Sequence, residues 1–251
     1  RRTKMKILKK IWSILKELNK LIFGFDLEEY SQNNETEENN ASQSANNENI
    51  APEETKPEIG ILEPFQGLKI IKKPIDDYIQ TSTKKRIIVL HYTAGGTLSG
   101  AEAQLSLKDY VNVHYGLDDD GTVYRYIDEK YYCYHTGTGK QLDSQAIGIE
   151  IRNWGHLDNK MKTWTGKQLP AEKVIKLNTF RGYQYWEKLT PQQIFILPLL
   201  INDFKSRWGY DMIVITHAQV KATKLDFPPD YPLIKDLITI KDYPVSLGRL
   251  L

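Results

Sequence analysis

The chain has 251 residues, of which 40% are hydrophobic, enough for one packed domain with appendages. Its 34 basic and 32 acidic residues give a formal net charge of +2, so the charge balance gives no indication of a nucleic-acid partner. The single cysteine, Cys133, excludes an intrachain disulfide and a site of several thiolates. Histidines and carboxylates therefore remain as metal ligands, and no apolar run of about 18 residues indicates a membrane-spanning helix.

Residues 1–25 predict a basic amphipathic helix, because apolar residues recur there at helical spacing among Lys and Arg. The apolar positions are Leu8, Ile11, Trp12, Leu15, Leu18 and Ile22. We expect this helix to bind a membrane surface or to pack on its own protein or a partner protein, and the sequence leaves these alternatives open. A secretory signal is disfavoured, since Lys16, Glu17 and Lys20 interrupt the apolar segment.

Residues 26–60 are rich in Asn, Glu and Ser and contain few large apolar side chains. Such a segment cannot bury enough surface to fold, which predicts an acidic flexible linker. From residue 61 the composition becomes that of a folded domain, predicted to extend over residues 61–251.

The first half of this domain contains two buried strands and a hairpin. The run "RIIVLHY", residues 86–92, predicts a buried strand that ends in the loop "TAGG". Ser99, with Glu102 three residues later, is typical of the start of a helix. Residues 114–128 predict two strands joined at Asp120-Gly121, and "AIGIEI", residues 146–151, is a further strand-like run.

The second half contains a long helix and one more strand. Residues 154–188 show little periodicity, which predicts a loop-rich insert that shapes a groove. Thr190 and Pro191 predict a helix start, with a bend at Pro198. Its apolar face comprises Ile194, Leu197, Ile201, Phe204 and Trp208. The run "MIVIT" predicts a short strand that ends on His217, so strands and helices alternate as in a mixed α/β domain.

Three side chains in the domain are candidate metal ligands. His91 and His217 each follow an apolar strand, and Asp226 lies on a loop that Pro228 and Pro229 stiffen. Two imidazoles and one carboxylate around zinc would leave a fourth position for water, the arrangement of a hydrolytic site. The alternative is a pair of strand-end histidines that bond only to the backbone.

Five segments, in this order, resemble the zinc-dependent N-acetylmuramoyl-L-alanine amidases related to phage lysozyme-amidases and peptidoglycan recognition proteins. They are "IIVLHYTAGG", "VNVHYGLDDDGTVYRYID", "YHTG", "AIGIEI" and "THAQVKATKLDFPP". The resemblance covers about Arg86 to Pro229 and implies a single mixed central β-sheet flanked by helices. It implies a cleft at one sheet edge, where His91, His217 and Asp226 bind Zn²⁺.

The resemblance also implies roles around the metal. Glu150 of "GIEI" would relay a proton between water and the leaving amine, and Lys224 would stabilise the oxyanion. His135 of "YHTG" would bind substrate, although a structural imidazole and a solvated lysine remain the alternatives for His135 and Lys224. We assign His114 to structure and give His156 no role.

The predicted activity is cleavage of the amide between N-acetylmuramic acid and L-alanine in bacterial peptidoglycan. The alternative is a non-catalytic peptidoglycan-binding module of a virion or cell-wall assembly. We expect a monomer that acts on the bacterial cell wall, and a phage-encoded endolysin or virion-associated lysin rather than a secreted bacterial enzyme. Residues 227–229 depart from the Pro-Gly that usually ends the family's ligand loop, which leaves the peptidoglycan type open.

Overall fold

A computed structural model describes residues 68–105, 107 and 110–250 of the chain. The basic helix predicted over residues 1–25 and the linker predicted over residues 26–60 lie outside these residues, as does the domain boundary at residue 61. Those three assignments stay predictions.

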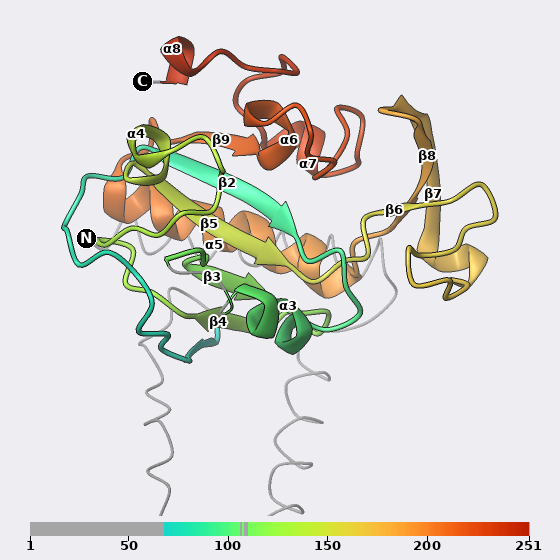
Figure 1. Ribbon diagram of the computed structural model, residues 1–251, viewed down its shortest axis with the longest axis horizontal. Coiled ribbons are helices and arrows are strands. Elements are labelled where there is room, and N and C mark those ends of the chain that lie inside the picture. Colours follow the sequence, from blue (N-terminus) through green and yellow to red (C-terminus); the bar gives the residue numbers. More distant parts are fainter. Residues whose placement is uncertain (1–67, 106, 108–109, 251) are drawn as a thin grey trace, which may run out of the picture. The chain divides into compact units, whose positions relative to one another are not determined.

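The core of the domain is a six-stranded mixed sheet in the order β1-β4-β3-β5-β2-β9 (Figure 1). All neighbouring strands run parallel except β3 and β4, which form the predicted hairpin. The strands are β1 (Ile70–Lys72), β2 (Ile87–Tyr92), β3 (Tyr115–Leu117), β4 (Val123–Arg125), β5 (Ala146–Ile151) and β9 (Ile213–Thr216). The predicted mixed central sheet flanked by helices is therefore confirmed.

Strand β2 lies between β5 and β9, and all six of its residues are buried. Its alternate side chains enter two hydrophobic clusters: Ile88 and Leu90 pack in the cluster that contains the buried face of α5, whereas Ile87 and Val89 pack in the other. A strand buried on both faces needs the near-continuous apolar run that the sequence supplies. The strand predicted over residues 86–92 is therefore confirmed, and His91 and Tyr92 are its last two residues, so that His91 lies within the end of the strand and not after it.

Helix α5 (Pro191–Trp208) begins as predicted, with a capping box in which the Thr190 side chain accepts a hydrogen bond from the backbone N–H of Gln193. On its predicted apolar face Leu197, Ile201 and Phe204 are buried, and Ile194 and Trp208 pack partly buried against the same cluster. The helix runs through Pro198, and a bend there stays a prediction. The remaining helices are α3 (Leu98–Leu105), α4 (Lys140–Asp143), α6 (His217–Val220), α7 (Ile234–Leu237), α8 (Leu247–Leu250) and the 3₁₀ helix η1 (Ala171–Lys173).

The predicted cap of α3 is displaced. The helix begins at Leu98, one residue before Ser99, and the Thr97 hydroxyl accepts the hydrogen bond from the Gly100 N–H at 3.2 Å. The Glu102 carboxylate bonds instead to Lys73 and to the Tyr126 hydroxyl. Thr97 and Ser99, which Leu98 separates, both carry a hydroxyl that can cap a helix start, and Thr97 occupies this position.

The predicted loop-rich insert contains a second, three-stranded antiparallel sheet in the order β6-β8-β7. The strands are β6 (His156–Leu157), β7 (Val174–Phe180) and β8 (Tyr183–Glu187). A small core of Trp154, Leu157, Leu169 and Val174 lies buried in this insert. The signal that could have indicated the hairpin is Arg181-Gly182 between two aromatic residues, because Gly favours the positive φ of a two-residue turn.

In the part of the chain that the structure describes, no helix has both the length and the apolar character needed to span a membrane.

Gly155 allows a close contact between the two sheets. Its φ is +73°, and a Cβ atom at this position would overlap the Tyr92 ring. We expect Gly155→Ala to lower the free energy of unfolding by about 3 kcal/mol or more, from backbone strain plus steric overlap. Gly166→Ala is the matched control, since Gly166 has φ +84° but open space around it. This substitution is expected to lower the free energy of unfolding by about 1 kcal/mol. Urea unfolding measures both, and equal losses would contradict the contact.

Candidate functional site

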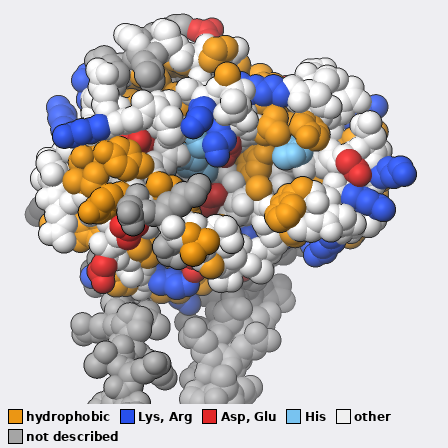
Figure 2. Space-filling model, viewed as in Figure 1, with side chains coloured by type: hydrophobic (Ala, Val, Ile, Leu, Met, Phe, Trp, Pro, Cys, Tyr) orange, Lys and Arg blue, Asp and Glu red, His pale blue; other side chains and the backbone are white. Residues whose placement is uncertain are grey.

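The candidate site lies on the sheet face opposite α5. In β2 and β5 the residues Ile88, Leu90, Ile147 and Ile149 face the cluster that contains α5. Side chains alternate along a strand, so His91 and Glu150 point to the opposite face, and they are also paired in the β2–β5 register. Figure 2 shows a histidine side chain in a hollow at the centre of one face, with basic and acidic side chains around it.

The structure brings His91, His217 and Asp226 together. All three are buried, and one ligand atom from each lies within 4.8 Å of the others. The Nδ1 atoms of His91 and His217 are 2.9 Å apart, and His217 Nδ1 is 3.7 Å from Asp226 Oδ2. Two ligand nitrogens in a tetrahedral zinc site are about 3.3 Å apart, so the donor types and their spacing fit this metal.

Hydrogen bonds to backbone groups orient two of the three candidate metal ligands, His217 and Asp226. His217 is the first residue of α6, and its Nε2 donates to the carbonyl of Thr136 at 2.8 Å, which leaves Nδ1 with its lone pair. Asp226 Oδ1 accepts a hydrogen bond from the backbone N–H of Tyr92 at 3.2 Å. Burial lowers the pKa of His91 and His217 below the usual value, and neutral imidazole is the form that binds a metal.

His135 lies behind His91. Its side chain is only 1% exposed, and its Nδ1 is 3.0 Å from His91 Nε2. When His91 Nδ1 is the ligand atom, Nε2 carries the hydrogen and donates to His135. His135 Nε2 is buried without a hydrogen-bond partner among the described residues and lies 3.9 Å from Asp143 Oδ1. Asp143 was not predicted to contribute to the site, since its only signal in the sequence is its position shortly before the "AIGIEI" strand.

Glu150 is partly exposed and lies beside His91, its partner in the β2–β5 register. Burial is the largest cause that raises the pKa of its carboxyl, to about 8, and the neighbouring Asp226 raises it further while Lys224 lowers it. Such a carboxyl can exchange a proton near neutral pH, which general acid–base catalysis needs. A carboxylate can interrupt this apolar strand because the Glu150 side chain lies on the sheet face opposite the cluster that contains α5, beside His91.

Lys224 is exposed and lies on the loop between α6 and Asp226. Its ammonium is close enough to the site to lower the pKa of His91 and His217. A flexible side chain there can place a positive charge at the hollow without desolvation.

The two remaining histidines, His114 and His156, differ in their burial and their contacts. His114 is buried, and its Nδ1 accepts from the Gly148 N–H while its Nε2 lies 3.2 Å from the Tyr131 carbonyl, so it has the predicted structural role. His156 lies at the edge of the second sheet and is partly exposed. Its Nδ1 is 3.2 Å from the Tyr92 hydroxyl, and its ring centre lies 4.1 Å from that of Tyr183, with the two ring planes inclined by 57°.

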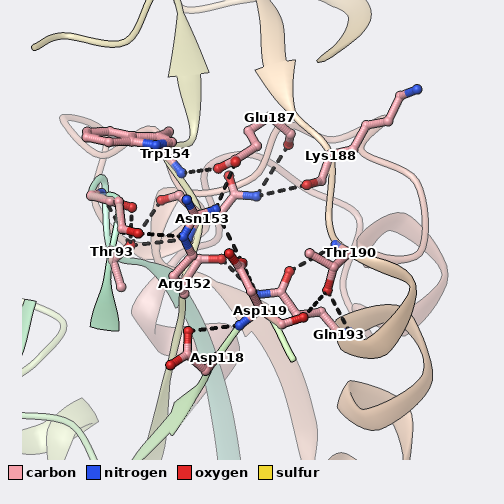
Figure 3. Close-up of polar contacts among 12 residues, drawn as sticks. Thr93, Asp118, Asp119, Arg152, Asn153, Trp154, Glu187, Lys188, Thr190 and Gln193 are labelled. Carbon is pink, nitrogen blue, oxygen red and sulfur yellow. Dashed lines mark hydrogen bonds and ion pairs between the residues drawn. The ribbon is translucent and has the colours of Figure 1, made fainter. Parts of the chain in front are cut away.

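A buried polar network holds the second sheet beside the site (Figure 3). Arg152, directly after β5, forms ion pairs with Glu187 of β8 at 2.8 Å and with Asp119 at 3.2 Å. The Glu187 carboxylate also accepts from the Trp154 N–H, and Gln193 of α5 donates to the Arg152 carbonyl. Arg152 and Glu187 are buried but paired with each other, so their burial is tolerated, whereas the Asp119 side chain is 45% exposed. These contacts fix the end of the strand that carries Glu150.

Comparisons with known proteins match the chain to one family. The family described as N-acetylmuramoyl-L-alanine amidase matches residues 81–229. No curated protein matches the chain.

Similar solved structures include the N-acetylmuramoyl-L-alanine amidase LysC from Clostridium intestinale URNW, with 18% identity over 67% of this chain and 95% of that chain, TM-score 0.46. The amidase AmiD from E. coli, solved with the substrate anhydro-N-acetylmuramic acid-L-Ala-D-gamma-Glu-L-Lys, has 20% identity over 63% of this chain and 59% of that one, TM-score 0.44. Drosophila peptidoglycan recognition protein SD has 16% identity over 62% of this chain and 87% of that one, TM-score 0.42.

The raised pKa of Glu150 predicts an effect on stability. A carboxyl group with a folded pKa above its unfolded value costs stability once the pH exceeds the unfolded pKa, and the cost grows until the pH reaches about 8. We therefore expect Glu150→Gln to stabilise the metal-free protein by about 1–3 kcal/mol at pH 8 and by less than about 1 kcal/mol at pH 5.

Urea unfolding of chelator-treated protein at both pH values measures this difference. Glu172→Gln, which replaces an exposed carboxylate in η1, is the control and should have little effect at either pH. The same effect from both substitutions at pH 8 would show that burial of Glu150 carries no cost.

Proposed function

The chain belongs to the N-acetylmuramoyl-L-alanine amidase family, and on that premise we propose that it is a zinc enzyme with ligands His91, His217 and Asp226. Its activity is that of a peptidoglycan amidase, directed at the amide bond between N-acetylmuramic acid and L-alanine of the bacterial cell wall. The single observation that carries the metal proposal is the convergence of two buried imidazole nitrogens and a carboxylate oxygen within 4.8 Å.

Zinc, when bound, would polarise the scissile carbonyl and lower the pKa of a water molecule to about 7. The protein side chains have separate tasks around it. His217 and Asp226 are held by backbone groups, so they enter the reaction already oriented. His91, in contrast, is oriented by His135.

Glu150 is the proposed general base and acid. Its carboxylate accepts a proton from the attacking water, and the resulting carboxylic acid returns that proton to the amine of L-alanine as the amide bond breaks. A pKa that burial raises toward the working pH supports both halves of this transfer.

Lys224 is the proposed oxyanion stabiliser, because its ammonium is exposed and interacts electrostatically with both ligand histidines. His135 is the proposed substrate-binding residue of the sequence analysis. Its burial against His91 supports a contribution through that ligand more strongly than direct contact with the sugar or peptide.

The alternative hypothesis, a non-catalytic peptidoglycan-binding module, is not favoured, since all three proposed metal ligands lie within the residues that match the family. We propose further that the protein is a phage-encoded endolysin or virion-associated lysin and acts as a monomer. The order of a basic segment, an acidic segment and an amidase domain supports a tethered lysin.

We expect the purified protein to bind one equivalent of zinc and to release stem peptides with a free L-alanine amino terminus from peptidoglycan. Chelation should abolish release and added zinc should restore it. Glu150→Gln should retain zinc and lower kcat by about 10²- to 10⁴-fold, because only proton transfer is lost. Metal analysis and amine release are the measurements, with Glu172→Gln as the active control.

The results of the zinc and amine-release measurements distinguish between the proposed functions. Zinc without amine release would support the binding module instead. Absence of zinc would refute the ligand assignment, and unchanged turnover in Glu150→Gln would remove Glu150 from the mechanism.

Residues 1–25 are proposed to attach the protein to a membrane surface or to a partner protein. We expect a variant that lacks them to hydrolyse soluble muropeptides at the full rate and to lose sedimentation with anionic vesicles or co-purification with a partner. Loss of soluble hydrolysis would contradict the tether, because the segment would then contribute to catalysis.

A further inference from the structure

The short segment from His217 to Asp226 carries two of the three proposed metal ligands and Lys224. Its only regular element is the four-residue helix α6. Isolated helices of this length are not stable in water, so contacts with other parts of the protein must hold the segment in place.

Arg181 of the second sheet makes such contacts. It occupies the tip of the β7–β8 hairpin, where Arg181 and Gly182 have φ values of +49° and +91° and connect the paired residues Phe180 and Tyr183. Two consecutive positive φ values turn the chain tightly, as in a two-residue hairpin loop. The turn directs the Arg181 side chain toward the ligand segment, and its guanidinium lies 4.7 Å from the centre of the Phe180 ring.

The guanidinium of Arg181 donates to three carbonyls of the ligand segment. Nη2 bonds to Ala218 at 3.0 Å, and Nη1 reaches Lys221 at 3.5 Å and also bonds to Lys224. These carbonyls belong to α6, to its C-terminal cap and to the loop before Asp226. A cation at a helix C-terminus is stabilising, and a planar fork of donors can bridge carbonyls that a point charge cannot.

We propose that Arg181 is a positioning residue for the metal site. By joining the carbonyls of Ala218, Lys221 and Lys224, it fixes the path of the chain between His217 and Asp226. The second sheet is then a part of the metal centre, although it contributes none of the proposed ligands. This inference rests on the zinc site of the proposed function.

The test compares zinc affinity in variants that keep the packing of the hairpin. Arg181→Met retains an unbranched stem over Phe180 and removes all donors, whereas Arg181→Lys retains the charge as a single point donor. Both have a side chain at the same positive φ, so backbone strain is matched. Lys176→Met is the control, since it removes a cation from β7 that lies over Tyr185 and bonds to none of the three carbonyls.

We expect Arg181→Met to weaken zinc binding about 10- to 100-fold in competition with a chromophoric chelator, and Arg181→Lys to fall between Arg181→Met and the unmodified protein. Lys176→Met should stay within about twofold of the unmodified protein. The visible absorption spectrum of the cobalt-substituted protein should change in Arg181→Met and not in Lys176→Met, because only the first alters ligand geometry.

Unchanged zinc affinity and an unchanged cobalt spectrum in Arg181→Met would overturn the inference. If Arg181→Met fails to fold, the result for Arg181→Lys decides. A zinc affinity of Arg181→Lys equal to that of the unmodified protein would then overturn the inference. Failure of the unmodified protein to bind zinc would instead refute the proposed function, so the two failures are distinguishable.

Discussion

The pairing of β2 between two parallel strands is the constraint on which the site depends. A strand with neighbours on both sides and side-chain clusters on both faces has no access to water until it ends. A polar side chain on it is tolerated only where other polar groups meet it. His91 satisfies this condition because β5 brings Glu150 alongside and the chain after β9 brings His217. The site is thus a direct outcome of strand order and register.

Desolvation favours the uncharged form of both the Glu150 carboxyl and the His91 imidazole. It raises the pKa of Glu150 and lowers that of His91, so both groups favour their neutral forms. Neutral imidazoles are ready to receive a divalent cation, and the charge of such a cation would favour the ionised carboxylate nearby. In the proposed zinc site, burial that is costly for the metal-free domain would therefore prepare the ligand set, at the expense of stability.

Much of the core could be predicted from the sequence, because apolar runs and turn residues determine it locally. The β3–β4 hairpin, the start of α5 at Thr190 and the strand before His217 are of this kind. The second sheet was missed because exposed polar residues such as Lys176 and Asn178 interrupt the apolar pattern of β7, and because its small core is assembled from residues that lie far apart in the sequence. The burial of His135 could not be predicted from the sequence either, since it depends on the packing of α4, which contains Asp143, and local periodicity does not encode that packing.

The second sheet also has a modular character. The side-chain amide of Asn153 donates to the carbonyls of Glu187 and Lys188, so the two ends of the insert, after β5 and before α5, are joined by hydrogen bonds. An insertion with adjoining ends can be lengthened, shortened or exchanged without any change in strand order. The proposed role of Arg181 at the tip of its hairpin would limit that freedom. A replacement insert without an equivalent cation would then keep the residues of the amidase site but hold the proposed zinc less tightly, so that evolution of the insert and of metal retention would be linked.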